Sequence, residues 1–196
     1  MRFTRSLSLL LLAAASCGVG HSDERARADA AAALATPGGA DSFPLAPALR
    51  GVDSRGGAFS LAALRGDAVV LLFYRSDSCP LCRERLAAAD AHLDAYRRAG
   101  ARVIAVTPDP PEIARRTAEA LALGVPIISA ERSTLEQWGV WLADEHAPRP
   151  AAIVIDREGR IRFRHVGRTA ADRAHDPDLL AVLRRVRGSG ADERGR

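Results

Sequence analysis

Cys79 and Cys82 lie in the stretch FYRSDSCPLC (73–82), with only a proline and a leucine between them. The apolar run VVLL (69–72) precedes this stretch and RERLAAADAHLDAY (83–96) follows it, so the cysteines stand where a strand pattern gives way to a helix pattern. A thiol is a poor nucleophile near neutral pH, with an ordinary pKa of about 8.5, but the N–H groups and dipole of a helix N-terminus favour the thiolate. The arrangement therefore predicts a reactive pair of thiols.

The position of Pro80 also indicates that a helix begins at the cysteine pair. With Cys79 as the helix N-cap, Pro80 occupies the first helical position, where its missing N–H costs nothing. Cys82 then lies one turn into the helix, close enough to Cys79 to form a disulfide. The sequence leaves open whether three neighbouring arginines add positive potential or face solvent: Arg75, Arg83 and Arg85.

Strand and helix patterns alternate along the chain, whose 196 residues, 47% hydrophobic and 27% charged, are enough for one domain with a core. Two short strands joined by a Gly-Gly turn (56–57) and a helical turn ending at Gly66 come before the strand at 68–74. The helix after the cysteines ends at Gly100 and has one apolar face, formed by Cys82, Leu86, Ala89, Leu93 and Tyr96. The later elements are a strand (102–107), a helix (111–124), a strand (126–129), a helix (134–140), a hairpin (151–156 and 160–166) and a helix after Asp176-Pro177. This order predicts an α/β fold with a central mixed β-sheet flanked by helices.

Three segments, in this order, resemble the thioredoxin superfamily and more closely its redoxin branch, the AhpC/TSA or peroxiredoxin-like family. FYRSDSCPLC resembles the peroxiredoxin stretch FYP followed by Thr-x-x-Cys, and TPDPPEIARRTAEALALGVPIIS (107–129) resembles the segment in which that family places a helix and a short strand. RPAAIVIDREGRI (149–161) resembles the strand and turn common to redoxins and thioredoxins. The resemblance covers about residues 43–186 and implies a thioredoxin-like fold.

The resemblance also implies roles for particular residues. It places Pro150, directly before a sheet strand, at the cis-proline that faces the cysteine pair in thioredoxins. Peroxiredoxins have their activating arginine at about this place, whereas this chain has Pro150 there and Arg149 one residue earlier. They also have a threonine where this chain has Cys79. Both departures favour disulfide exchange over peroxide reduction, with Cys79 and Cys82 catalytic and with Pro80, Arg149 and Pro150 binding the substrate.

Other interpretations of the cysteine pair remain open. A zinc site needs about four ligands, and the only other cysteine, Cys17, belongs to the N-terminal signal described below, so no metal is expected. A copper site of the assembly-chaperone type would resemble a redoxin with a wider cysteine spacing, and His146 would be its distant ligand. A purely structural disulfide would stabilise the fold little, because it closes a very short loop.

Two further functions are alternatives to thiol–disulfide exchange. In a thiol peroxidase, a hydroperoxide would oxidise Cys82 to a sulfenic acid and Cys79 would resolve it as a disulfide. A redox-inactive binding module on a thioredoxin scaffold is the alternative of another class. The expected partners are protein thiols or disulfides, hydroperoxides in the peroxidase alternative, and an upstream electron donor.

Residues 1–16 have the pattern of a signal peptide, with arginines at 2 and 5 and an apolar stretch shorter than the roughly 20 residues of a membrane span. Ala14-Ala15-Ser16-Cys17 resembles the lipobox of bacterial lipoproteins, with Ala14 in place of the usual leucine, so Cys17 is expected to carry a lipid. Plain secretion and a cytoplasmic protein with an apolar N-terminus are the alternatives. Residues 17–41 are expected to form a flexible tether, 42–187 the redoxin domain and 188–196 a disordered tail. The chain is therefore expected to be exported and anchored to a membrane through its lipid.

The distribution of charge does not indicate a nucleic-acid partner. All 28 basic residues are arginines, the formal net charge is +4, and no arginine run is longer than two residues. No glycine-rich phosphate loop or dinucleotide fingerprint occurs, so no nucleotide cofactor is expected.

Several other side chains are expected to have structural roles or to lie at the surface. The aromatic residues Tyr96, Trp138 and Trp141 are expected in the core or at its rim, and Asp109 and Glu112 are expected to cap a helix. Three histidines have no partner visible in the sequence and are expected at the surface: His92, His165 and His175.

Overall fold

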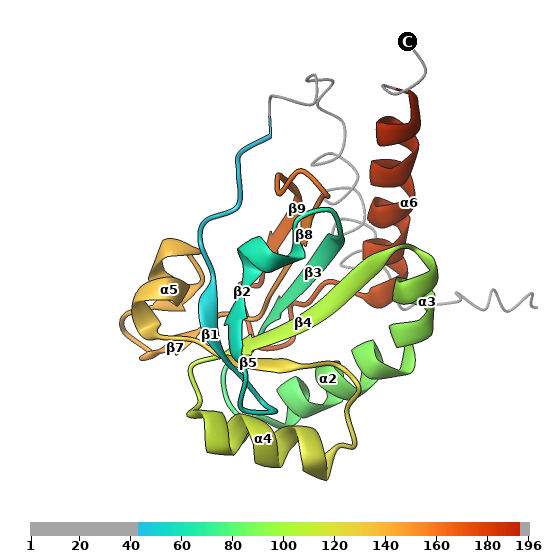
Figure 1. The fold of residues 1–196 in the computed structure, drawn as a ribbon. Helices are drawn as coiled ribbons and strands as arrows, with labels where there is room; N and C mark the ends of the chain where they lie inside the picture. Colours follow the sequence, from blue (N-terminus) through green and yellow to red (C-terminus); the bar gives the residue numbers. More distant parts are fainter. Residues whose placement is uncertain (1–42, 193–196) are drawn as a thin grey trace, which may run out of the picture. The chain divides into compact units, whose positions relative to one another are not determined.

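The computed structural model describes residues 43–192, with side chains described as far as residue 187 (Figure 1). The expectations for the signal peptide, for the lipid on Cys17 and for the tether fall on residues 1–42, outside the described residues. No helix in the described part is long and apolar enough to cross a membrane.

A seven-stranded mixed sheet forms the centre of the fold, in the order β2-β1-β5-β4-β3-β8-β9. Strand β3 pairs in parallel with β4 and antiparallel with β8, while β4 pairs in parallel with β5. The strands are β1 (Arg50–Asp53), β2 (Ala58–Ser60), β3 (Ala68–Phe73), β4 (Ala101–Thr107), β5 (Ile127–Ser129), β8 (Ala151–Ile155) and β9 (Ile161–Val166). A separate two-stranded ribbon consists of β6 (Trp141–Leu142) and β7 (Ala147–Pro148).

Helices flank the sheet, which confirms the predicted thioredoxin-like α/β fold (Figure 1). They are the 3₁₀ helix η2 (Leu61–Leu64) and the α-helices α2 (Pro80–Ala91), α3 (Leu93–Arg98), α4 (Pro111–Ala120), α5 (Arg132–Gln137) and α6 (Asp176–Asp192). Helix α6 therefore extends past residue 187, where the domain was expected to end.

Strand β3 is buried along its whole length because both of its faces are covered. Leu71 and Phe73 point to the face where Leu135 of α5 and the adjacent Trp138 join the same hydrophobic core. Side chains alternate along a strand, so Leu72 points to the opposite face, where it lines a small cavity together with residues of α2. The strand that leads into the cysteines is thus fixed from both sides.

The helix that follows the cysteines is shorter than the pattern predicted and is succeeded by a second helix. Helix α2 ends at His92, whose φ of −99° and ψ of 5° interrupt the helical backbone before α3 begins. The Nδ1 atom of His92 lies 2.9 Å from the carbonyl oxygen of Ala88. Tyr96 in α3 is nevertheless fully buried, as its place in the apolar pattern predicted.

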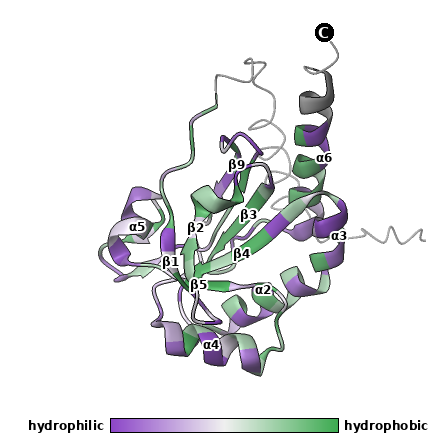
Figure 2. Cartoon of the chain, viewed as in Figure 1, coloured by the Kyte–Doolittle hydropathy of each residue, from purple (hydrophilic) through white to green (hydrophobic). Residues whose placement is uncertain are grey.

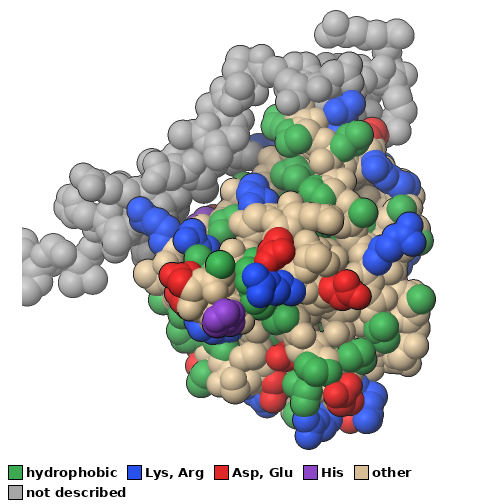
Figure 3. Space-filling model, turned by 90° about the vertical axis from the view of Figure 1, so that its left-hand side faces the viewer, with side chains coloured by type: hydrophobic (Ala, Val, Ile, Leu, Met, Phe, Trp, Pro, Cys, Tyr) green, Lys and Arg blue, Asp and Glu red, His purple; other side chains and the backbone are tan. Residues whose placement is uncertain are grey.

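Hydrophobic residues concentrate in the central strands, whereas α3 and α4 carry many hydrophilic residues (Figure 2). On the face drawn in Figure 3, basic, acidic and apolar side chains are interspersed. Some exposed arginines pair with a carboxylate one helical turn away, as Arg115 does with Glu119 and Arg132 with Glu136. Such exposed pairs contribute only about 0.3–0.5 kcal/mol each.

Candidate active site

Cys79 and Cys82 form a disulfide at the start of α2, with their Cα atoms 5.2 Å apart. Cys79 is the N-cap of the helix: its backbone is extended, and its Sγ accepts a hydrogen bond from the backbone N of Cys82 at 3.2 Å. Pro80 occupies the first helical position. The three residues therefore take the places that the sequence pattern predicted for them.

The two sulfur-bearing residues differ in exposure. Cys82 is buried, with 1% of its surface exposed, and lies on the helix face that also buries Leu86 and Ala89. Cys79 is half-buried, and the following Pro80 and Leu81 are exposed. A large partner can therefore reach the sulfur of Cys79 more readily than that of Cys82.

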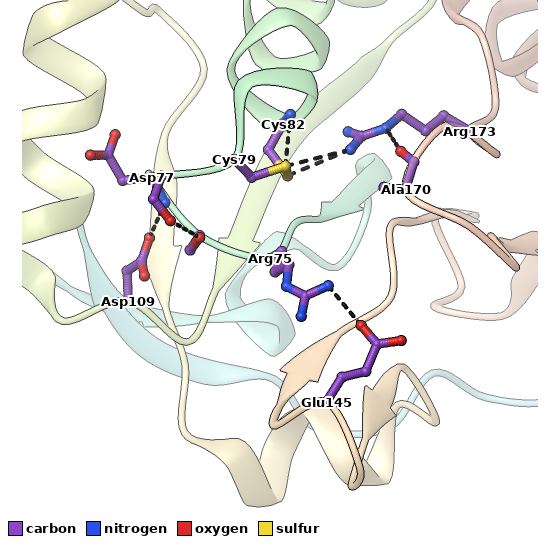
Figure 4. The surroundings of a disulfide bond; sticks show 10 residues. Arg75, Asp77, Cys79, Cys82, Asp109, Glu145, Ala170 and Arg173 are labelled. Carbon is purple, nitrogen blue, oxygen red and sulfur yellow. Dashed lines mark hydrogen bonds and ion pairs between the residues drawn. A yellow bond between two sulfur atoms is a disulfide. The ribbon is translucent and has the colours of Figure 1, made fainter.

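The guanidinium in contact with the disulfide belongs to Arg173, in the segment between β9 and α6. Its Nη2 lies 3.5 Å from the Sγ of Cys82 and 3.9 Å from the Sγ of Cys79, and its Nε donates to the carbonyl oxygen of Ala170 at 2.6 Å (Figure 4). Burial, together with the charge of nearby Arg85, lowers the pKa of Arg173, yet an arginine remains protonated at neutral pH. A positive charge is thus held against both sulfurs.

The sequence did not single out Arg173. It lies 91 residues beyond Cys82, and none of the three family-like segments includes it. The three arginines near the cysteines in sequence bind carboxylates: Arg75 pairs with Glu145 at 2.7 Å, Arg83 with Asp77 at 2.6 Å, and Arg85 with Asp176 at 2.9 Å.

Carboxylates fix the loop that leads to Cys79. The Oδ2 of Asp109 accepts a hydrogen bond from the backbone N of Asp77 at 2.7 Å (Figure 4), and the Oδ1 of Asp77 accepts one from Thr117 at 2.8 Å. Burial raises the pKa of Asp109. The expectation that Asp109 caps a helix is wrong, because Pro110 is the N-cap of α4 and Asp109 binds the cysteine loop instead; Glu112 lies in the first turn of α4.

The segment that carries Arg173 is fixed at both ends. At its start, Gly167 N donates to the carbonyl oxygen of Pro150 at 2.8 Å. At its end, Asp176 accepts two hydrogen bonds from Arg85, each of 2.9 Å, and one from the hydroxyl of Tyr96 at 2.6 Å. Arg173 therefore approaches the sulfurs from a segment that α2 and α3 hold in place.

Comparisons with known proteins agree with this geometry. The model of the AhpC/TSA family matches residues 43–164. This chain belongs to the AhpC/TSA family. It is 29% identical over 123 residues to a protein of Mycobacterium tuberculosis assigned to the peroxiredoxins, which covers 59% of this chain and 78% of that protein. It is 28% identical over 114 residues to the chloroplastic peroxiredoxin Q of Populus jackii, covering 57% and 53% of the two chains.

Solved structures of AhpC/TSA relatives share the fold. The crystal structure of peroxidoxin BcpB from Mycobacterium tuberculosis matches with a TM-score of 0.64 at 22% identity, over 73% of this chain and 96% of that one. Peroxiredoxin Q of Xanthomonas campestris matches with a TM-score of 0.62 at 20% identity, over 74% and 96%. The expected family is confirmed, and the homologues make this chain an enzyme of thiol-dependent redox chemistry.

One expectation drawn from the AhpC/TSA resemblance is wrong: Pro150 is not cis, because the described residues contain no cis peptide bond. The trans form is the one that X-Pro bonds favour, by about 0.5–1 kcal/mol. Backbone hydrogen bonds hold the chain on both sides of this bond, since Arg149 N donates to Val140 at 2.7 Å and Pro150 accepts from Gly167. These groups are therefore not free to pair with a substrate strand.

Arg149 and Pro150 nevertheless lie close to the cysteines. Both line a small depression of about 50 Å³ that also contains Cys79 and Cys82. Arg149 makes no ion pair or side-chain hydrogen bond within the part of the chain that the structure describes. Of Arg149 and Arg173, only Arg173 contacts the sulfurs.

The aromatic residues serve the core, as expected. Trp138 is buried against Phe73, with ring centroids 5.6 Å apart, while Trp141 is half-buried. Burial raises the pKa of both buried tyrosines, Tyr74 and Tyr96. The hydroxyl of Tyr74 has no hydrogen-bond partner of normal geometry among the described residues.

No described histidine lines either of the two cavities beside the disulfide. His165 has a neighbour that the sequence did not reveal: its Nε2 lies 2.9 Å from Asp172, in ion-pair range when the ring is protonated but without hydrogen-bond geometry. His175 is exposed, and His146 is exposed in the loop between β6 and β7. No three His, Cys, Asp or Glu side chains within residues 43–187 cluster as metal ligands would.

Proposed function

We propose that this chain is a thiol–disulfide oxidoreductase that cycles between the Cys79–Cys82 disulfide and the two free thiols. The observation that carries the proposal is the disulfide at the start of α2, with the sulfur of Cys79 toward the surface and Arg173 against both sulfurs. In the reduced protein the Cys79 thiolate attacks a partner's disulfide, which forms a mixed disulfide and releases one partner thiolate. The Cys82 thiolate then attacks the sulfur of Cys79 and releases the second, so two electrons pass to the partner.

Three features support this cycle. The Cα separation of 5.2 Å lies within the range that disulfides require, so the pair can close inside the first turn of α2 without unwinding it. The N-cap position provides N–H groups for the Cys79 thiolate. Opposite charge within about 4–6 Å favours an ionised group, and the guanidinium of Arg173 lies within that range of both sulfurs.

A thiol peroxidase is the second candidate, because Arg173 lies closer to Cys82 than to Cys79 and the relatives named above are peroxiredoxins. The Cys82 thiolate would attack a hydroperoxide, form a sulfenic acid and release an alcohol or water. Cys79 would then displace water from that sulfenic acid to form the disulfide, and two external thiols, or one dithiol, would reduce it. Exchange remains the first candidate because Cys82 is buried, with 1% of its surface exposed, whereas Cys79 is half-buried and more accessible to a partner protein.

Single cysteine variants distinguish the two candidates. In the exchange cycle, Cys82→Ser accumulates mixed disulfides with partner proteins because the resolving thiol is missing, whereas Cys79→Ser forms none. Adducts are detected as reductant-sensitive bands on gels of cell extracts. In the peroxidase cycle, Cys82→Ser abolishes peroxide consumption, and Cys79→Ser leaves a sulfenic acid that a dimedone-type probe labels.

Strong dimedone labelling of Cys79→Ser, with no adduct in Cys82→Ser, would contradict the exchange function and support the peroxidase function. A wild-type disulfide that no thiol reductant opens, with neither readout in the variants, would instead favour a redox-inactive binding module.

We also propose that the protein is exported and carries a lipid on Cys17. The support is the sequence alone: the apolar stretch after Arg5 and the lipobox-like Ala14-Ala15-Ser16-Cys17. Cys17→Ser should move the protein from the detergent phase to the aqueous phase, because acyl chains provide the membrane affinity. A variant that still partitions into detergent would contradict the lipid anchor.

A further inference from the structure

Arginines outnumber carboxylates around the disulfide. The depression that contains Cys79 and Cys82 is lined by a single carboxylate, Glu145, and by four arginines: Arg75, Arg149, Arg168 and Arg173. The arginines come from three segments that are far apart in sequence, namely the loop after β3, the loop before β8 and the segment after β9. The fold thus gathers positive charge at a site where the sequence showed only scattered arginines.

The carboxylates that face these arginines neutralise only part of the charge. Arg75 pairs with Glu145 at 2.7 Å. The side chain of Arg168 is 91% exposed, and within residues 43–187 the one carboxylate that it approaches is Asp172, 3.9 Å from its Nε. Asp172 also accepts a hydrogen bond from the backbone N of Arg168 and neighbours His165.

Arg149 and Arg173 have no carboxylate partner within residues 43–187. Of the carboxylates near the disulfide, Asp77 binds Arg83 and Asp176 binds Arg85, while Glu84 acts on Arg173 through its charge without forming an ion pair. The depression therefore keeps a net positive charge, because four arginines and a single carboxylate line it and neither Arg149 nor Arg173 forms an ion pair among the described residues. A concentration of one sign of charge around a reactive group raises the association rate of oppositely charged partners.

The shape of the depression indicates the size of the partner. Its volume of about 50 Å³ is well below the roughly 300–1,000 Å³ of pockets that enclose small molecules. Exposed apolar surface adjoins it, because Leu81 is 41% exposed directly after Pro80. An extended segment of a partner protein, bound across the surface, fits so shallow a depression better than an enclosed small molecule does.

We propose that the partner of this site is a protein whose reacting cysteines are flanked by aspartate or glutamate residues. The proposal rests on the exchange function proposed above and specifies the electron donor of that cycle, the partner that converts the Cys79–Cys82 disulfide back to two thiols. Carboxylates beside the partner's cysteine meet Arg149, Arg168 and Arg173 as its sulfur reaches Cys79. A partner thiolate attacks Cys79 and releases the Cys82 thiolate, and the second partner thiolate then releases Cys79. The partner dithiol becomes a disulfide, and two electrons reduce the protein.

Synthetic peptides with a Cys-x-x-Cys pair test this proposal. Three peptides differ only in the flanking residues, which are acidic, serine or basic, and each is mixed in excess with the oxidised full-length protein. The acidic peptide should react about 10-fold faster than the basic one at low ionic strength. The difference should largely vanish at 1 M salt, where the Debye length falls from about 30 Å at 0.01 M to about 3 Å.

Charge-reversal variants localise the effect. Arg149→Glu combined with Arg168→Glu should remove or invert the preference for the acidic peptide over the serine peptide. The matched control combines Arg55→Glu, in the turn between β1 and β2, with Arg184→Glu in α6; it changes the net charge equally and should keep the preference.

Three results would overturn the proposal: equal, measurable rates for all three peptides in the wild type, an equal loss of preference in the control variant, or a faster reaction with glutathione than with the acidic peptide. The last result would identify a small carboxylate-bearing thiol as the partner. If no peptide reduces the disulfide at all, the exchange function itself fails.

Discussion

The disulfide lies between the loop before Cys79 and the segment between β9 and α6, and the charged side chains of these two segments are paired to different extents. On one side, the loop before Cys79 has its charges satisfied within the protein: Asp77 binds Arg83 and Thr117, and Asp109 accepts from the backbone of Asp77. On the other side, the segment before α6 holds Arg173 against the sulfurs, and among the described residues no carboxylate forms an ion pair with it, although the charge of Glu84 acts on it. The loop determines where the sulfurs lie, whereas the segment determines how well a thiolate is stabilised there.

The largest expected effect tests what fixes the segment before α6. Asp176→Asn should lower the free energy of unfolding by about 3 kcal/mol, because it leaves the largely buried guanidinium of Arg85 without its carboxylate. Urea unfolding measures this. Asp94→Asn is the control, since Asp94 pairs with Arg97 at the surface and should cost under about 1 kcal/mol. A loss no greater than that of the control would mean that other contacts hold the segment.

The next effect tests the role of Arg173. In Arg173→Met, the pH midpoint of thiolate formation in the reduced protein should rise by about one unit, because an opposite charge beside the sulfurs is lost. The reduction potential should fall by about 30 mV, since the thiolate form loses the same free energy. Thiolate absorbance and redox titration measure the two values. Arg149→Met should change neither value. If Arg149→Met changes both values and Arg173→Met changes neither, the arginine that stabilises the thiolate is Arg149, near the position of the activating arginine of peroxiredoxins.

The smallest expected effect is on the pH dependence of stability, and it tests the role of Asp109 in fixing the loop before Cys79. Burial raises the pKa of Asp109 above its ordinary value of 3.8, so the folded state binds a proton there more tightly than the unfolded state does. The stability contributed by this group is therefore greatest at low pH and declines as pH rises from about 3.8 through the raised folded pKa. Asp109→Asn should remove that decline, with a slope difference of at most about 1.4 kcal/mol per pH unit. Parallel stability curves for the two proteins would show that Asp109 ionises as easily in the fold as in the unfolded chain.

Local patterns predicted the strand and the helix start that position the cysteines, whereas long-range contacts fix the rest of the site, including the hydrogen bond from Asp77 to Asp109 in the loop. A buried apolar run and a proline after Cys79 are enough to place a strand and a helix start, because each depends on neighbouring residues. The break at His92 was not predictable in this way, since the apolar spacing from Cys82 to Tyr96 stays helical across it. Distant contacts hold the segment that brings Arg173 to the sulfurs, among them the bond from Arg85 to Asp176, and no short pattern in the sequence records such a contact.

The disulfide joins residues separated by three positions, within a helical turn whose backbone hydrogen bonds are already formed. Opening it need not change the course of α2. What reduction adds is negative charge, placed directly against Arg173. A protein that must tell the oxidised from the reduced form would then recognise the difference by its electrostatics rather than by its outline, and an acidic partner drawn to the oxidised form would be held less strongly once it had delivered its electrons.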